Sequence, residues 1–154
     1  MKAILASIIQ SRTTSLYPSE FKPACEGREK KALGNQFNLN QFGVNLVKLL
    51  PGAASSQRHY HLQEDEFIYV LSGNITLVIN EGEEILSPGM CCGFKAGDPN
   101  GHQLINKTAE PVEYLEIGTR SLNDEIIYPD IDLQAFKENG NARFTHKDGT
   151  PYTE

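Results

Sequence analysis

The stretch RHYHLQEDEFIYVLSG, residues 58–73, carries two histidines and an acidic run into a segment with strand character. From residue 66 onward, Glu66, Ile68 and Val70 would share one face of an extended strand, because successive strand side chains point to opposite faces. Ser72 and Gly73 then interrupt the run, as turn residues do. The stretch predicts a β-strand over residues 66–73, preceded by a histidine pair that could bind a metal.

The same succession of strand-like segments and turn residues continues through the middle of the chain. Short segments of strand character, separated by turn residues, predict further strands at residues 41–50, 74–80, 83–89, 90–95, 102–106 and 111–118. A series of short strands is typical of an all-β sandwich or barrel. One helical signal appears, DLQAFKENG at residues 132–140, with Asp132 as the N-cap and Gly140 as the stop. We therefore expect an all-β fold with one short C-terminal helix.

The length of 154 residues suits one domain, so residues 1–154 are expected to form a single unit. Strand rhythm is dense only over residues 41–119, which we predict to be the barrel core. Residues 1–40 are then an N-terminal arm, and residues 120–154 a C-terminal extension. Such segments would pack on the barrel and cover its edges or those of a partner subunit.

Composition excludes several classes of partner. The chain has 20 acidic residues against 14 Lys and Arg and no basic cluster interleaved with aromatics, which argues against nucleic acid binding. No segment approaches the roughly 18 apolar residues of a membrane span. Cys25, Cys91 and Cys92 are odd in number and two are adjacent, so they predict free thiols in a reducing, cytoplasmic setting. Either Cys91 or Cys92 should point inward, because neighbours on a strand face opposite ways.

His59 and His61 are two residues apart, so on a strand both would project to one face. A hairpin that pairs His61 with Glu66 would set this carboxylate beside the histidines, because residues opposite each other in an antiparallel pair share a face. Asp65 has the wrong parity, and Glu64 falls in the loop. The sequence thus favours Glu66 as the acidic partner of the two histidines.

A third histidine follows on a later strand, where His102 can face the same interior. Three imidazoles and one carboxylate suit a single borderline divalent ion such as Fe, Mn, Ni, Co, Cu or Zn, whereas Ca and Mg prefer more oxygen ligands. Leaving such groups unpaired in a barrel would cost roughly 1–3 kcal/mol each, a cost that a metal removes. His146 has no comparable setting and is expected in the tail.

These residues resemble the first motif of the cupin superfamily, which has the shape G-x5-H-x-H-x(3,4)-E-x6-G. The matching residues, with one extra residue after the first glycine, are Gly52, His59, His61, Glu66 and Gly73.

The second cupin motif, G-x5-P-x-G-x2-H-x3-N, is matched at Gly89, Gly97, His102 and Asn106. Lys95 stands where proline is usual, and residues 98–101 make a spacer of four residues rather than two. Beyond the motifs, nearly the whole chain looks like one group of small single-domain bacterial cupins of the conserved-barrel type, which has no settled substrate.

The resemblance implies a double-stranded β-helix, or jelly-roll, barrel that forms a homodimer. It also implies four metal ligands, His59, His61, Glu66 and His102. Four protein ligands leave a position open on the ion, which a catalytic metal needs. We therefore expect a metal-dependent enzyme, a dioxygenase, an isomerase or epimerase, or a lyase, acting on a small oxygen-rich molecule. The alternatives are a binding or sensing module whose metal anchors a small ligand, and a protein that uses the metal for stability alone.

Overall fold

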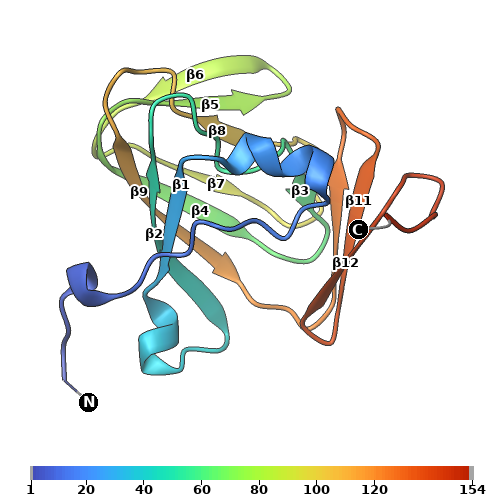
Figure 1. Ribbon diagram of the computed structural model, residues 1–154, viewed down its shortest axis with the longest axis horizontal. Helices are drawn as coiled ribbons and strands as arrows, with labels where there is room; N and C mark the ends of the chain where they lie inside the picture. Colours follow the sequence, from blue (N-terminus) through green and yellow to red (C-terminus); the bar gives the residue numbers. More distant parts are fainter. Residues whose placement is uncertain (1, 153–154) are drawn as a thin grey trace.

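Antiparallel strands dominate the protein, as the alternating sequence predicted (Figure 1). The computed structural model describes residues 2–152. Its strands are β1 (Arg28–Ala32), β2 (Phe42–Leu49), β3 (Tyr60–His61), β4 (Glu66–Ser72), β5 (Ile75–Ile79), β6 (Gly82–Leu86), β7 (Cys91–Phe94), β8 (Gln103–Ile105), β9 (Val112–Thr119), β10 (Asp124–Tyr128), β11 (Leu133–Glu138) and β12 (Asn141–Thr145). Three short 3-10 helices precede β2, namely η1 (Ala6–Ile8), η2 (Ser19–Cys25) and η3 (Gly34–Phe37). None of the described helices has the length and apolar character to span a membrane.

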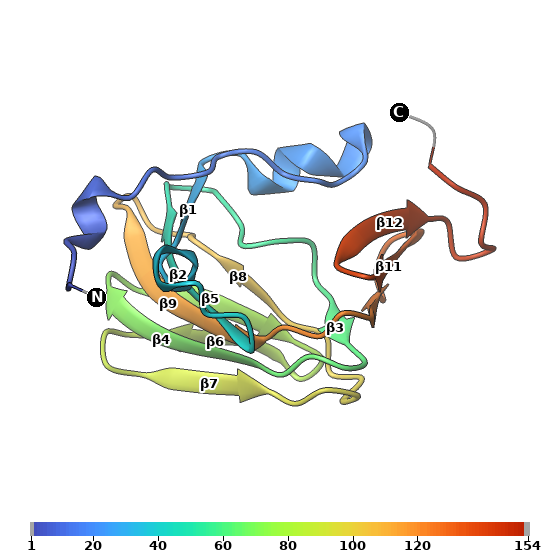
Figure 2. The ribbon, with the colours of Figure 1, turned by 90° about the horizontal axis from the view of Figure 1, so that it is seen from below.

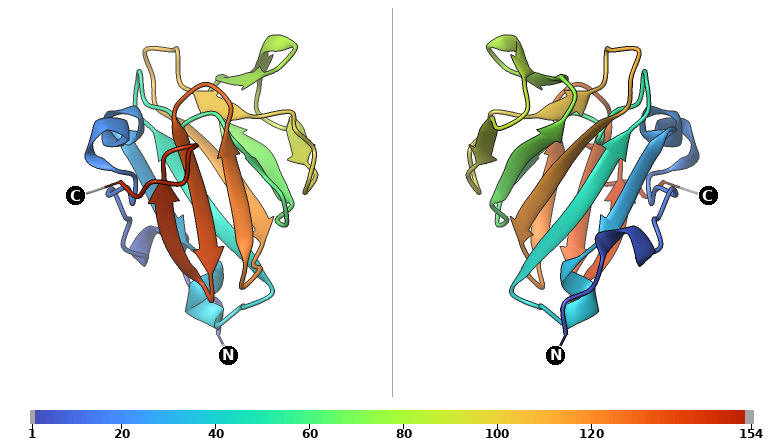
Figure 3. Two further views of the ribbon diagram at one scale, coloured as in Figure 1. Left: turned by 90° about the vertical axis from the view of Figure 1, so that its right-hand side faces the viewer. Right: turned by 90° about the vertical axis from the view of Figure 1, so that its left-hand side faces the viewer.

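The strands form two facing layers, which Figure 3 shows from opposite sides. One layer is the five-stranded sheet β1-β2-β9-β4-β7. The other layer combines the sheets β6-β5-β8 and β12-β11-β10-β3. Isolated bridges of Ala54 with Ile105 and of His59 with His102 connect the segment that leads into β3 to β8 and its flanking residues. The result is the expected jelly-roll barrel.

Two hydrophobic clusters hold the layers together. The larger cluster joins the five-stranded sheet to β5, β6 and β8 through Val47, Leu49, Ala53, Ile68, Val70, Ile75, Leu77, Leu86, Leu104, Val112 and Tyr114. The smaller cluster packs η2 and the segment before it onto β10 and β11 through Tyr17, Cys25, Tyr128, Leu133 and Ala135. Figure 2 shows η2 lying over the side of the barrel between β1 and β12. The N-terminal segment thus covers its own barrel and also adds β1 to the sheet edge.

The short C-terminal helix expected at residues 132–140 was wrong. Residues Leu133–Glu138 form β11, in which Leu133 and Ala135 are buried with the period of two that a strand requires. Asn139 and Gly140 have φ values of 50° and 82° and connect β11 to β12 as a two-residue hairpin loop. An Asn-Gly pair favours this turn, so Gly140 reverses a hairpin and does not end a helix.

Gly73 ends β4 at a place where a side chain would not fit. Its φ is 74°, and an added Cβ would lie 2.6 Å from Cγ1 of the buried Val112. Gly52 has a similar φ of 83°, but a Cβ there would meet nothing within 4 Å. Both glycines therefore have a left-handed backbone, but only at Gly73 would a side chain also overlap a neighbour.

We predict that Gly52→Ala costs about 1–2 kcal/mol of unfolding free energy, since a left-handed backbone disfavours a Cβ. Gly73→Ala should cost about 1–3 kcal/mol more than Gly52→Ala, because Val112 has no room to move in the core. Urea denaturation of both variants measures the difference. Equal destabilisation would contradict the close packing of Gly73 on Val112.

Candidate metal centre

Two reciprocal backbone hydrogen bonds place His59 beside His102. The His59 N–H donates to the His102 carbonyl at 3.1 Å, and the His102 N–H donates to the His59 carbonyl at 2.8 Å. The two residues are therefore directly opposite on neighbouring extended segments, and their side chains share a face. Their rings lie with centroids 4.7 Å apart.

The other two residues come from different sheets. His61 lies on β3, which pairs with β10 by setting His61 opposite Ile126. Glu66 begins β4 in the facing layer, where it pairs with Phe94 and Gly118. The expected hairpin between His61 and Glu66 was therefore wrong, because each strand finds its partner far along the chain. The two side chains still meet, since both point into the space between the layers.

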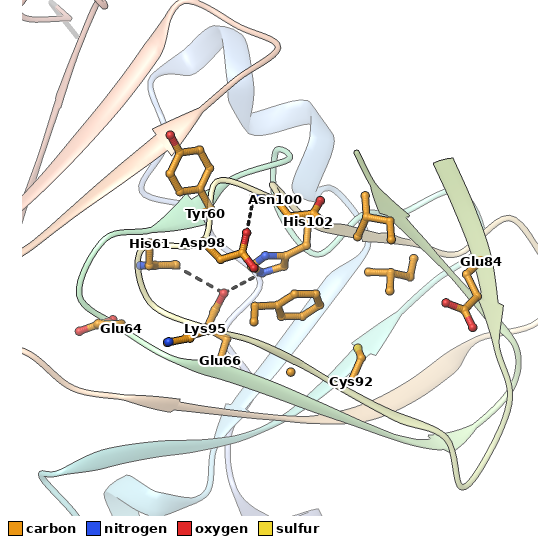
Figure 4. Close-up of a pocket in the computed structure, with 14 residues that line it drawn as sticks. Tyr60, His61, Glu64, Glu66, Glu84, Cys92, Lys95, Asp98, Asn100 and His102 are labelled. Atoms are coloured by element: carbon orange, nitrogen blue, oxygen red, sulfur yellow. Dashed lines mark hydrogen bonds and ion pairs between the residues drawn. The ribbon is translucent and has the colours of Figure 1, made fainter. Parts of the chain in front are cut away.

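All four predicted side chains meet at Glu66 Oε2, and Figure 4 shows His61, Glu66 and His102 of this group. Glu66 Oε2 lies 3.6 Å from Nε2 of His59, 3.6 Å from Nε2 of His61 and 2.7 Å from Nε2 of His102. Ligand atoms of His59, His61 and Glu66 all lie within 4.8 Å of one another. The structure thus brings together every residue that the sequence selected.

The outer ring nitrogens of His59 and His61 have acceptors that turn their Nε2 atoms inward, whereas His102 Nδ1 is buried without a partner among the described residues. His59 Nδ1 lies 2.9 Å from the Gln57 carbonyl, which can only accept, so Nδ1 carries the proton. His61 Nδ1 contacts the carboxylate of Asp124, a buried residue. The His102 ring stacks on Phe94 with centroids 3.6 Å apart and planes within 4°. Hydrogen bonding of the outer nitrogen to a carbonyl or carboxylate is the usual way in which proteins orient metal-binding histidines.

This arrangement fits a cation. With protons on the Nδ1 atoms, His59 and His61 turn Nε2 lone pairs toward the buried Oε2 of Glu66, so acceptors face acceptors. A positive charge at the meeting point resolves that conflict. Three imidazole nitrogens and a carboxylate oxygen are the donor set of a transition metal.

Burial and neighbouring charges shift the pKa of Glu66, His61 and His102. Burial would raise the pKa of Glu66, but its contacts with His102 and His59 outweigh burial and hold that pKa well below the usual range. Burial alone lowers the pKa of His61, yet the carboxylates of Asp124 and Glu66 raise it overall. For His102, burial prevails and the pKa is lowered. Glu66 is therefore anionic and His102 neutral, whereas His61 holds a proton more tightly and must release it to bind a metal.

Two cavities adjoin the cluster. The larger, about 400 Å³, lies between the five-stranded sheet and β10–β12. The smaller, about 250 Å³, extends past the other side of the cluster. Both are lined by the four residues His61, Glu64, Glu66 and His102. The cluster is therefore open to small molecules from more than one direction.

Other residues named from the sequence have definite places. Cys92 lines the smaller cavity (Figure 4) and Cys91 is exposed, so Cys92 is the cysteine that points inward. Asp65 points away from the cluster and accepts a hydrogen bond from the Ala96 N–H at 2.8 Å. His146 is outside the cluster and contacts Asp132 at 2.8 Å.

Glu64 differs from its expected role as a turn carboxylate. It lies in the loop before β4, but it turns inward and lines both cavities. Together with His61 and Asp124 it forms a second group whose ligand atoms lie within 4.8 Å of one another.

Sequence reasoning missed Asp124, because a single carboxylate at the start of a strand belongs to no motif. It also missed Tyr114 and Glu116, which line the larger cavity. In this case a signal existed: both lie on β9 in alternate positions with the buried Val112, so strand parity directs them to the interior.

Comparison with known proteins gives relatives over almost the whole chain. A sugar phosphate isomerase from a cupin superfamily of Silicibacter pomeroyi is 43% identical, with 99% of this chain and 97% of that chain covered at a TM-score of 0.95. A protein of Acidithiobacillus ferrooxidans, provisionally described as a sugar phosphate isomerase, is 26% identical, with 96% and 90% covered at a TM-score of 0.79.

More distant relatives share the fold alone. A polyketide cyclase of Streptomyces resistomycificus is 18% identical, with 79% of this chain and 80% of that chain covered at a TM-score of 0.65.

The Cupin domain family matches residues 45–118. No curated protein sequence matches the chain.

We predict that Asp124→Asn weakens metal binding about 10- to 100-fold, because the amide no longer orients His61 as a charged acceptor does. Competition with a chelator measures the affinity. Asp132→Asn removes the same kind of contact from His146 and should leave metal affinity unchanged. An Asp124→Asn protein that binds metal as tightly as the wild type would rule out this orienting role.

Proposed function

The chain belongs to the cupin superfamily, and from the site that its barrel builds we propose that it is a metal-dependent isomerase of a small phosphorylated sugar. The observation that carries the proposal is the convergence of three imidazole Nε2 atoms on the Glu66 carboxylate at a shared wall of two cavities. The Silicibacter pomeroyi relative, similar over 97% of its chain, supports the reaction class.

His59, His61, Glu66 and His102 would hold one divalent transition metal, Fe, Mn, Ni, Co, Cu or Zn. Such an ion polarises a carbonyl group and so makes the hydrogen on the neighbouring carbon more acidic. Isomerisation then needs a base that takes this proton and returns it to the former carbonyl carbon. The isomerisation is redox-neutral overall, so it needs no external oxidant or reductant.

Two carboxylates in the larger cavity are available as that base. Glu116 on β9 pairs with Lys30 and accepts a hydrogen bond from Asn45 Nδ2 at 3.1 Å, both through Oε1. Glu64 Oε1 pairs with Lys137 Nζ at 2.7 Å. In each case a lysine forms an ion pair with Oε1, and Oε2 has no hydrogen-bond partner among the described residues. Each carboxylate is thus positioned on a cavity wall with an oxygen free to move a proton.

We predict that protein purified without a metal-affinity tag carries close to one transition metal ion per chain. Glu66→Gln and His61→Ala should each lose most of it, because each removes one ligand. Elemental analysis measures the content. Asp65→Asn is the matched control next in sequence and should keep its metal. Full retention in both ligand variants would refute the assignment.

We predict that the metal-loaded protein interconverts an aldose phosphate and a ketose phosphate and, in D₂O, incorporates deuterium next to the carbonyl. Removal of the base should slow kcat about 10²- to 10⁴-fold with metal content unchanged. Glu116→Gln and Glu64→Gln, assayed by NMR, identify which carboxylate acts. Full activity in both variants would exclude proton transfer by either.

The same assay separates the competing functions. Oxygen consumption with any substrate would favour a dioxygenase, and bond cleavage would favour a lyase. Saturable binding of sugar phosphates without turnover would favour a binding or sensing module. The homodimer, the cytoplasmic location and the domain boundaries expected from the sequence stay predictions.

A further inference from the structure

We propose that Arg28 and Tyr114 form an anion-binding site in the larger cavity, and that this site holds the phosphate group of the ligand. The choice of ligand rests on the proposed sugar phosphate isomerase function. The site itself is argued from unpaired polar groups that both line this cavity.

Arg28 carries a charge that nothing in the described chain balances. Its NH1 atom donates to the Ser55 carbonyl, while its Nε is buried and has no hydrogen-bond partner. Within residues 2–152, Arg28 takes part in no ion pair, although neighbouring Lys30 on the same strand pairs with Glu116. Arg28 is half-buried, and charges drawn away from water are normally paired, so an anion from outside the chain would suit this guanidinium.

Tyr114 supplies a second unused donor. Its side chain has 0% exposure, yet its hydroxyl finds no partner among residues 2–152. Burial raises the pKa of Tyr114 well above its usual value, so the phenol keeps its proton and can donate it to an acceptor. Buried hydroxyls without a partner are uncommon in folded proteins. Thr145 has one too but does not line this cavity, so position in the cavity is what singles out Tyr114.

Strand register places both groups on the face that carries Glu66. Tyr114 is opposite Val47, which in turn is opposite Lys30, and Arg28 lies two positions before Lys30 on β1. Directly opposite residues share a face, as do residues two apart on one strand. Arg28, Tyr114 and Glu66 therefore all project between the layers.

Register also gives the separation of the two sites. Glu66 is opposite Gly118, which lies four residues from Tyr114 along β9. At the usual rise per residue, this is about 13 Å between backbone positions. The side chains extend from both ends into the same cavity. A small sugar can thus present its carbonyl to the cluster and its phosphate to Arg28.

The ligand class follows from these donors. A guanidinium offers a planar fork of N–H groups that matches two oxygens of a phosphate or carboxylate. A phenol adds one further donor. A phosphate monoester has enough oxygens for all of them and carries the greater negative charge, so it is favoured over a carboxylate.

Calorimetric titration of the protein with inorganic phosphate tests the site, in metal-loaded and in metal-stripped form. We expect phosphate to bind both forms. Arg28→Met should weaken that binding at least tenfold, and Tyr114→Phe severalfold, with metal content unchanged. Arg120→Met is the matched control, because Arg120 lines the same cavity but already donates to Leu39 and Asn35. It should change phosphate affinity less than twofold.

Tyr114→Phe loses only a hydroxyl without a protein partner, so circular dichroism should show an intact fold. No phosphate binding by the wild type, binding only when metal is present, or equal binding in both variants would overturn the site. Preference for a dicarboxylate over phosphate would overturn the ligand class. Phosphate binding that depends on Arg28 without any sugar phosphate turnover would refute the isomerase proposal alone. Turnover with binding indifferent to Arg28 would refute this site alone.

Discussion

The site depends on the pair of backbone hydrogen bonds between His59 and His102. These bonds connect the β6-β5-β8 sheet to the β12-β11-β10-β3 sheet and so complete one layer of the barrel. The same two bonds set two imidazoles side by side on the inner face. Glu66 in the other layer then needs only to reach across the interior to meet them.

The cluster is costly for a protein to maintain by itself. A buried polar group without a partner costs roughly 1–3 kcal/mol, and a domain has only roughly 5–15 kcal/mol of total stability. In this barrel the conflict at Glu66 Oε2 and the unpaired Arg28 and Tyr114 occur around one interior cavity. Other charges on the wall of the same cavity are paired, as in Lys30 with Glu116 and Lys137 with Glu64. The unpaired groups around this cavity are therefore the places where bound groups would fit.

The sequence predicted the local features of this fold well. Strand alternation located β2, β4 and β9 to within about two residues. The shared face of His59 and His61 was also predictable, because parity depends only on local geometry. Pairing partners were not, since β3 pairs with β10 across more than sixty residues of chain. Strand alternation still identified Glu66 correctly, because a side chain that points inward reaches the barrel interior from either layer.

The C-terminal extension failed for a different reason. Leu133 and Phe136 have helical spacing, and Gly140 is also a frequent residue after a helix, so two local rules agreed on the wrong element. Burial of Leu133 and Ala135 against η2 decided for the strand, which is a contact that local sequence does not reveal. Asp124 was invisible for the same reason, because its role exists only through the fold that brings it to His61.

X-ray absorption spectroscopy of the metal-loaded protein tests the central claim most directly, since it reports the atoms bound to the ion. We expect nitrogen and oxygen ligands only, with the scattering pattern of three imidazoles. A sulfur ligand, which Cys92 in the adjoining cavity could supply, or fewer than three imidazoles would contradict it.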